Sequence, residues 1–406
     1  MSRKPWGTYI YLAGDNSLAD AALVDLNEME EVGSGPGLDV FVQVDRGFGP
    51  PMAGTLRLHI EADTDPATVT SPVLANLGQT NAGDPVIVSA FLDEAREKYP
   101  ATQELVVLWN HGSGFLVPEE MMPNERGFRG RERSRAKKRL KRLFFSTGPE
   151  TILEAPPEVR GILYDDGSGD CLDNVELARL VADLHEKAGH KLAVLGMDAC
   201  LMTMIEVAVQ IRDHVELLVG SEEEEPGNGW SYKDVLEAQA AGCTADELAA
   251  AIVDSYVASY PDTERITQSA IRLDKLDGLV AAVDALAGAL LAQDPDVSSF
   301  ELLKAVRRSP RFYDSLYVDL GALAVHLTEV SGSQPVATAC EAILAELANP
   351  DGPILAHAAK GPKMAECTGI SIYLPMPRLP SDHYGELAFA KITRWGEVLD
   401  KVLSGF

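Results

Sequence analysis

The amino-acid sequence predicts an α/β protein: a doubly wound, mostly parallel sheet flanked by helices, with a mainly helical C-terminal subdomain. Two apolar runs carry this prediction, Leu105–Trp109 and Leu192–Met197. Each is short, rich in strand-forming residues and bounded by Gly and polar residues, as parallel strands covered on both faces are. Strand and helix patterns alternate around them, and such alternation favours a sheet with helices on both faces.

The N-terminal part supplies the elements of this sheet. Thr8–Ala13 is the first expected strand, and the turn at 14–17 is expected to cap a helix that runs to Glu31. Further strands are expected at 38–44, 55–60 (a hairpin arm), 105–109, 161–164, 192–197 and 215–220, and helices at 84–98, 174–187 and 201–211. We therefore assign residues 5–245 to the first domain.

Beyond residue 245 the sequence is dominated by Ala- and Leu-rich helical patterns. Helices are expected at 245–260, 275–293, 321–330 and 337–348, and two strands, 266–273 and 369–374, are candidates to extend the main sheet. Residues 246–406 are accordingly assigned to a mainly helical C-terminal subdomain.

Composition and charge restrict the class of partner. The chain has 406 residues, 46% of them hydrophobic, and a formal net charge of −27 at pH 7. Nucleic acid and anionic membranes would meet like charge over most of the surface, so cationic substrates are the expected counterpart. No apolar run approaches the ~20 residues that span a bilayer. Since Met1–Pro5 leads directly into a strand pattern, a cytoplasmic location is expected, with secretion as the alternative if a leader has been removed.

The cysteines indicate reduced thiols. There are five of them, without a CxxC pair or a Cys/His cluster at zinc spacing, so neither a disulfide framework nor a metal site is expected.

The two apolar runs each end next to a reactive side chain. The first leads into Asn110-His111-Gly112-Ser113-Gly114 and the second into Asp198-Ala199-Cys200. The carboxyl ends of parallel strands share one edge of a sheet, where ligands bind. A thiol is a strong nucleophile only as the thiolate, and a neighbouring imidazole can take its proton. The sequence therefore predicts that His111 and Cys200 meet at this edge.

Five short motifs, in this order, resemble the clostripain-like cysteine peptidases, relatives of the caspase, legumain and gingipain group. They lie within residues 6–235: Trp6 with Leu12-Ala13-Gly14-Asp15-Asn16, then 110–114, 165–170, 198–202 and 226–230; residues 369–375 add a softer match. The resemblance implies a caspase-like fold in which His111 and Cys200 form a dyad that cleaves peptide bonds after Arg or Lys through a thioacyl-enzyme. It also implies an oxyanion hole made by the backbone N–H groups of Gly112 and Cys200.

No cofactor is expected, with calcium as the open alternative, because some relatives depend on it. Carboxylates are the oxygen ligands that Ca²⁺ prefers, and the candidates, which lack the spacing of a known calcium loop, are Asp15, Asp165, Asp166 and Asp170.

A basic side chain at the cleavage site requires a carboxylate in its pocket. Asp198 is the first candidate, because side chains two residues apart in an extended segment point to the same side, here that of Cys200. The acidic run that follows strand 215–220 adds Glu222 and Glu225, although such runs are more often solvated surface.

One segment differs in charge from the rest of the chain. Residues 126–142 hold ten Lys or Arg and one acidic residue, within an expected loop of about 116–160 between the His111 and Cys200 strands. A solvated insert is one interpretation. The other is self-cleavage, which would turn a monomer into two noncovalently held chains; its candidate sites are Arg133, Arg135, Lys138, Arg139 and Arg142.

Two other functions compete with peptidase activity. A catalytically silent scaffold could keep the fold and bind partners, although both candidate catalytic residues are present. An esterase or amidase that uses Ser113 is disfavoured because this serine is not in a GxSxG turn.

Overall fold

The computed structural model of the protein describes residues 3–47, 52–115, 161–376, 380–381 and 383–403. Within these residues, nine strands form the main sheet. Their bounds are β1 Lys4–Ala13, β2 Leu38–Asp45, β3 Thr55–His59, β4 Val73–Asn76, β5 Ala101–Trp109, β8 Leu192–Asp198, β9 Val215–Gly220, β10 Ile266–Arg272 and β13 Ile354–Lys360. The strand order is β13-β10-β9-β8-β5-β1-β2-β3-β4. The five central strands, from β9 to β2, are parallel, and the outer pairings on both sides are antiparallel.

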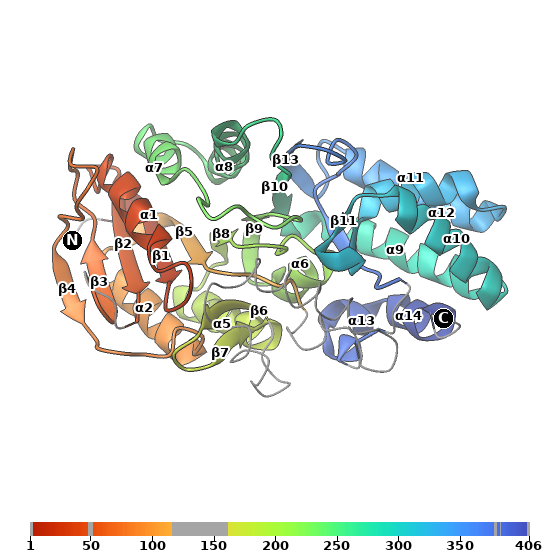
Figure 1. Ribbon diagram of the computed structural model, residues 1–406, viewed down its shortest axis with the longest axis horizontal. Helices are drawn as coiled ribbons and strands as arrows, with labels where there is room; N and C mark the ends of the chain where they lie inside the picture. Colours follow the sequence, from red (N-terminus) through yellow and green to blue (C-terminus); the bar gives the residue numbers. More distant parts are fainter. Residues whose placement is uncertain (1–2, 48–51, 116–160, 377–379, 382, 404–406) are drawn as a thin grey trace, which may run out of the picture.

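Helices cover both faces of this sheet, which confirms the doubly wound prediction (Figure 1). One face carries α1 Ala21–Glu30, α7 Tyr232–Ala240 and α8 Ala245–Ser259, and the other carries α2 Pro85–Lys98, α5 Asn174–Ala188 and α6 Ile205–Ile211. Alternation along β1 fills both cores: Ile10 and Leu12 pack on the first face, Tyr9 and Tyr11 on the second.

The C-terminal region is mainly helical, as expected, and lies at the β13 end of the sheet (Figure 1). Its helices are α9 Leu276–Leu291, α10 Pro295–Arg308, α11 Leu320–Val330, α12 Gln334–Ala348, α13 Ala388–Ile392 and α14 Trp395–Leu403. Three short strands, β11 Arg311–Phe312, β12 Tyr317–Asp319 and β14 Ser371–Tyr373, form a second sheet, and β6 Gly161–Asp165 pairs with β7 Asp170–Asp173. Single 3-10 turns occur at Leu273–Lys275, Tyr313–Ser315 and Tyr384–Glu386.

Of the two strands expected after residue 245, only the first extends the main sheet. β10 pairs with β9, whereas β14 pairs with β12 in the small sheet. Strand β13, which the sequence analysis missed, adds the edge of the main sheet beyond β10. The C-terminal region thus completes the sheet that the N-terminal region begins, and the division at residue 245 stays a prediction.

Two helices begin later than the sequence suggested. Helix α1 begins at Ala21 instead of at the 14–17 turn, because that turn is used elsewhere: Asn16 Nδ2 donates to the carbonyl oxygens of Ala13 and Tyr164. Helix α6 begins at Ile205 instead of Leu201, because Leu201 has φ +69° and its N–H donates to the Glu223 carbonyl. Both missing helical turns belong to the edge of the sheet where the candidate site lies.

No helix in the described part of the chain is long and apolar enough to cross a bilayer.

Candidate active site

The segments that carry His111 and Cys200 lie side by side at the carboxyl edge of the sheet. β5 and β8 are neighbouring parallel strands, with Trp109 opposite Asp198, and Asn110 N donates to the Asp198 carbonyl at 3.2 Å. The two backbones then approach so closely that a Cβ on Gly112 would lie 2.3 Å from the Cys200 carbonyl oxygen and 3.2 Å from Cys200 N. Only glycine fits at this contact.

The His111 ring is largely buried, with 6% of the residue exposed. Its Nε2 lies 3.1 Å from Ser17 Oγ, in the turn that follows β1. Burial lowers the pKa of His111 to about 3, since the imidazolium would lose its hydration. The imidazole is therefore neutral at physiological pH.

Cys200 follows β8 in a turn and is half-buried. Its Sγ accepts a hydrogen bond from the backbone N–H of Glu225 at 3.2 Å. Burial, and next the negative charge of Glu225, raise the thiol pKa well above its usual range. The thiol is therefore protonated in this state, and the pair at rest would be neutral instead of thiolate and imidazolium.

Two backbone donors are available beside Cys200. Within the described residues, the N–H groups of Gly112 and Cys200 have no hydrogen-bond acceptor. Because the two segments pack against each other at this point, both N–H groups belong to the same small region, as an oxyanion hole requires.

The Asp198 side chain is buried, with 4% of the residue exposed. Its Oδ2 accepts from Tyr232 Oη at 2.9 Å and from Trp230 N at 3.3 Å. Glu225 approaches the same carboxylate, and burial together with the Asp198 charge raises the pKa of Glu225 well above its usual range. Burial also raises the pKa of Asp198, but the hydrogen bonds that it receives oppose this shift. The two acids can therefore share one proton, with the negative charge favoured on Asp198.

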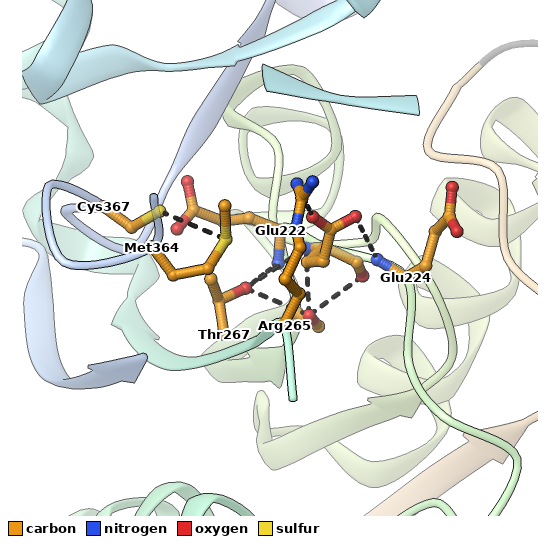
Figure 2. A network of polar contacts seen from close by, with 8 residues as sticks. Glu222, Glu224, Arg265, Thr267, Met364 and Cys367 are labelled. Atoms are coloured by element: carbon orange, nitrogen blue, oxygen red, sulfur yellow. Dashed lines mark hydrogen bonds and ion pairs between the residues drawn. The ribbon is translucent and has the colours of Figure 1, made fainter. Parts of the chain in front are cut away.

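The other candidate substrate acid lies elsewhere. Glu222 is fully buried, and its Oε2 accepts from Gly369 N at 3.2 Å, beside Asp319 and Cys367 of the C-terminal region (Figure 2). The structure thus brings Asp198 and Glu225 together and separates Glu222 from them by its contacts. The five candidate cleavage residues between 133 and 142 lie outside the described residues.

Ser113, the alternative nucleophile, is fully buried. Its Oγ lies 2.7 Å from Tyr164 Oη and 3.3 Å from the Gly161 carbonyl, so it joins the β5 end to β6. This environment favours a structural role.

Of the calcium candidates, three aspartates approach one another. The charges of Asp165 and Asp45 add to burial to raise the pKa of Asp15 to about 6, and those of Asp15 and Asp165 do the same for Asp166. Asp170 instead accepts from Asn81 Nδ2 and Cys171 N. Among the described residues, the group with ligand atoms within 4.8 Å of one another is a different one, Glu222, Asp319 and Cys367.

Sequence reasoning missed the contacts that hold the site from a distance. Ser17 comes from the β1 turn and Tyr232 from α7, and nothing in the local pattern of either residue marks it. The contact of Ser17 with His111 could have been predicted only from the position of β1 next to β5, because Ser17 lies in the turn that follows β1.

A caspase-like sheet with a thiol and an imidazole at the ends of adjacent central strands defines a class, the caspase-like cysteine peptidases. The model of the clostripain family of peptidases matches residues 10–129 and 141–401. The chain belongs to the clostripain family.

Individual relatives agree with this assignment. Clostripain from Hathewaya histolytica is 25% identical over 249 residues, which cover 56% of this chain and 37% of that protein, so the match spans little more than a third of the curated relative. The fold resembles that of a secreted C11 cysteine protease from Bacteroides thetaiotaomicron, solved with an irreversible peptide inhibitor, with TM-score 0.63 and 20% identity over 98% of this chain and 99% of that one. It also resembles an inactive zymogen C11 protease from Parabacteroides distasonis, with TM-score 0.67 and 17% identity over 97% and 99% of the two chains.

Proposed function

We propose that this protein is a cysteine endopeptidase that cleaves after Arg or Lys, with Cys200 as nucleophile and His111 as general acid and base. The observation that carries the proposal is the packing of the Gly112 backbone on Cys200, at the ends of neighbouring strands in a chain of the clostripain family. The proposal is supported by this close approach of the segments that carry the thiol and the imidazole, and by two N–H groups there that have no acceptor among the described residues.

In this mechanism the Cys200 proton moves to His111 as Sγ attacks the scissile carbonyl carbon, and the N–H groups of Gly112 and Cys200 stabilise the oxyanion. His111 then gives the proton to the leaving amine and takes one from the water that hydrolyses the thioacyl-enzyme. Since burial leaves both groups neutral at rest, attack and proton transfer must occur together.

The Asp198–Glu225 pair is proposed to bind the basic side chain. It is buried, carries an ionised carboxylate, and adjoins Cys200 through the Glu225 N–H. A guanidinium or ammonium group that enters here would offset the charge that raises the pKa of the thiol, so the correct substrate would help to generate its own nucleophile.

Activation by self-cleavage within 126–142 is part of the proposal. Its support is the density of basic residues in that segment, which matches the proposed specificity, and the fold shared with a relative described as an inactive zymogen.

The decisive experiment compares wild type with Cys200→Ala, and uses Cys243→Ser as a control for the other half-buried thiol. A biotinylated arginyl acyloxymethyl ketone should label wild type and Cys243→Ser but not Cys200→Ala. Fluorogenic peptides that differ only in Arg, Lys, Gln or Ala before the cleaved bond should be cut only when that residue is basic. An unlabelled wild type with no peptidase activity would favour the scaffold function.

Self-cleavage can be measured by mass spectrometry of the intact protein. Wild type should give cuts after basic residues within 126–142, whereas pure Cys200→Ala should stay intact until active enzyme is added. Processing of pure Cys200→Ala would reject this part of the proposal.

Two secondary proposals are activity without a cofactor, with calcium bound by Asp15, Asp165, Asp166 and Asp170 as the alternative, and a cytoplasmic location. Fractionation of the native host would test that location against secretion, which is stated for the Bacteroides thetaiotaomicron relative.

A further inference from the structure

A positively charged cavity lies in the C-terminal region of the chain, although the chain as a whole has a net charge of −27. Its volume is about 410 Å³, and its lining includes Arg265, Arg307, Arg308, Arg311 and Lys363, against one acid, Glu366, among the side chains that the structure describes. These cations come from four places: the residue before β10, the last turn of α10, β11 and the loop after β13. The dipole of α10 stabilises the positive charges of Arg307 and Arg308 in its last turn, whereas the other three cations are not in the last turn of a helix.

Among the described side chains, only two of these five cations pair with an acid. Arg265 pairs with Glu223, Arg308 with Glu329, and Glu366 contacts His326. Arg307, Arg311 and Lys363 make no ion pair with any residue that the structure describes. Arg307 and Lys363 are exposed and Arg311 is half-buried, so all three can meet a ligand.

The backbone of the cavity is also unusual. Two of its lining residues, Ser315 and Lys363, have φ near +70°, a region that residues with a Cβ adopt rarely. Non-glycine residues held in this conformation gather at ligand sites more often than elsewhere.

One residue joins the cavity to the nucleophile turn. The Glu223 carbonyl accepts from Leu201 N at 3.2 Å, directly after Cys200, while the Glu223 carboxylate pairs with Arg265. In the view of Figure 2, Arg265 lies between Met364, which lines the cavity, and Glu224, which follows Glu223. Because β10 runs antiparallel to β9, its first residues lie at the same edge of the sheet as Cys200.

We propose that this cavity, built by Arg307, Arg311 and Lys363 beside the nucleophile turn, is a subsite for an acidic side chain of the peptide substrate. The inference rests on the proposed function and extends it from one substrate residue to two: a basic residue at the Asp198–Glu225 pair and a carboxylate some residues away. An extended peptide advances about 3.3 Å per residue, so the acidic residue would occupy one fixed position relative to the scissile bond, which a positional peptide series can identify. Arginine binds carboxylates with paired hydrogen bonds, which suits this role.

The overall charge makes such a subsite selective. An acidic peptide is repelled by most of this surface, so its binding depends on the local positive field of the cavity. The rate should therefore depend on where in the peptide the acid lies, and the preference should weaken as salt screens it.

The test uses fluorogenic peptides with a fixed Arg before the cleaved bond and Glu or Gln at each neighbouring position in turn. We expect Glu at one position to raise kcat/KM about tenfold over Gln. In the double variant Arg311→Glu/Lys363→Glu the Glu:Gln ratio should fall to one or below. Lys304→Glu, on the same helix as Arg307 but outside the cavity lining, should keep the wild-type ratio. Arg265 is left unchanged because its loss would also release Glu223.

Binding of the same peptides, fluorescently labelled, to Cys200→Ala protein separates this inference from the proposed function. No hydrolysis by wild type, together with no probe labelling of Cys200, would overturn the proposed function. Equal affinity of Cys200→Ala for Glu and Gln peptides, or a Glu preference that survives Arg311→Glu/Lys363→Glu, would overturn the acidic subsite. Melting curves identify any variant that fails to fold, in which case Arg307→Gln replaces it.

Discussion

Gly112→Ala should separate the two catalytic segments with the smallest possible change. A Cβ at this position would lie 2.3 Å from the Cys200 carbonyl oxygen and 3.0 Å from Ala199 Cβ. The first distance is about 1 Å inside ordinary contact. Neither partner is a flexible side-chain end, so the backbone of one segment must move by a comparable amount.

A displacement of about 1 Å in a catalytic group typically costs about 100-fold in rate, which corresponds to ~2.7 kcal/mol of transition-state stabilisation. The same overpacking should lower the free energy of unfolding by about 1–3 kcal/mol. We therefore expect kcat/KM for an Arg peptide to fall about 100-fold, with a folded protein and a reduced melting temperature.

The matched control is Gly227→Ala, in the turn just after Glu225. A Cβ there would meet no other part of the chain within 4 Å, so activity should stay within about twofold of wild type. If Gly112→Ala kept activity within threefold while Gly227→Ala did the same, the close approach of the two segments would not govern catalysis, and our account of the site would be wrong.

Three further predictions concern charge. Asp198→Asn should lower kcat/KM for Arg peptides by about 30-fold or more, since it removes the carboxylate proposed to pair with the substrate's basic side chain. The control, Asp234→Asn at an exposed position on α7, should have little effect. Equal losses in both variants would argue against a role of Asp198 in binding the basic side chain. The pKa of the Cys200 thiol is raised and that of His111 is lowered to about 3. The rate at which iodoacetamide labels Cys200 in a Cys243→Ser background should therefore still increase with pH at pH 9. A rate that reaches a plateau below pH 7 would indicate a resting thiolate–imidazolium pair instead. The pKa of Asp15 and of Asp166 is raised to about 6 in the folded state from an ordinary 3.8, so the folded state binds more protons than the unfolded state between these values and stability should increase as the pH falls from 7 to 5. Asp15→Asn should flatten that profile, and millimolar Ca²⁺ should raise the melting temperature of wild type but not of Asp15→Asn if calcium binds there.

The sequence was sufficient for the centre of the fold because burial on both faces leaves a clear mark. β5 and β8 are continuous apolar runs, and their neighbours β1 and β9 follow the same pattern. The edges were harder. β13 reads as Ile-Leu-Ala-His-Ala-Ala-Lys, without strong alternation, and only its pairing with β10 makes it a strand.

Helix α10 was missed despite a clear local signal. Asp294 caps it and Pro295 occupies its first turn, a combination typical of helix starts. Its moderate polarity hid it between the apolar α9 and α11. The local sequence of α10 therefore contains enough information to predict this helix.

For the candidate site, residue type and order singled out His111, Cys200 and Asp198, because each lies at or just beyond the end of an apolar strand. Spacing could not distinguish Glu222 from Glu225, which are three residues apart in one acidic run. The tertiary structure distinguishes them: Glu225 N reaches Cys200 Sγ, whereas Glu222 is held by Gly369, 147 residues further along the chain. The positively charged cavity could not be predicted from the sequence either, since its cations come from four separate segments.

The place of the 116–160 segment in the topology has a mechanical consequence. It connects β5 to the part of the chain that contains β8, and these strands are neighbours near the middle of the sheet, with β1 on the far side of β5 and β9 on the far side of β8. A single backbone break in this segment would leave both fragments interlocked by the β5–β8 ladder and by the helices packed over it. The nicked protein should elute as one particle in native gel filtration and separate into two bands only after denaturation, and nicking alone would be an irreversible event that leaves the architecture intact.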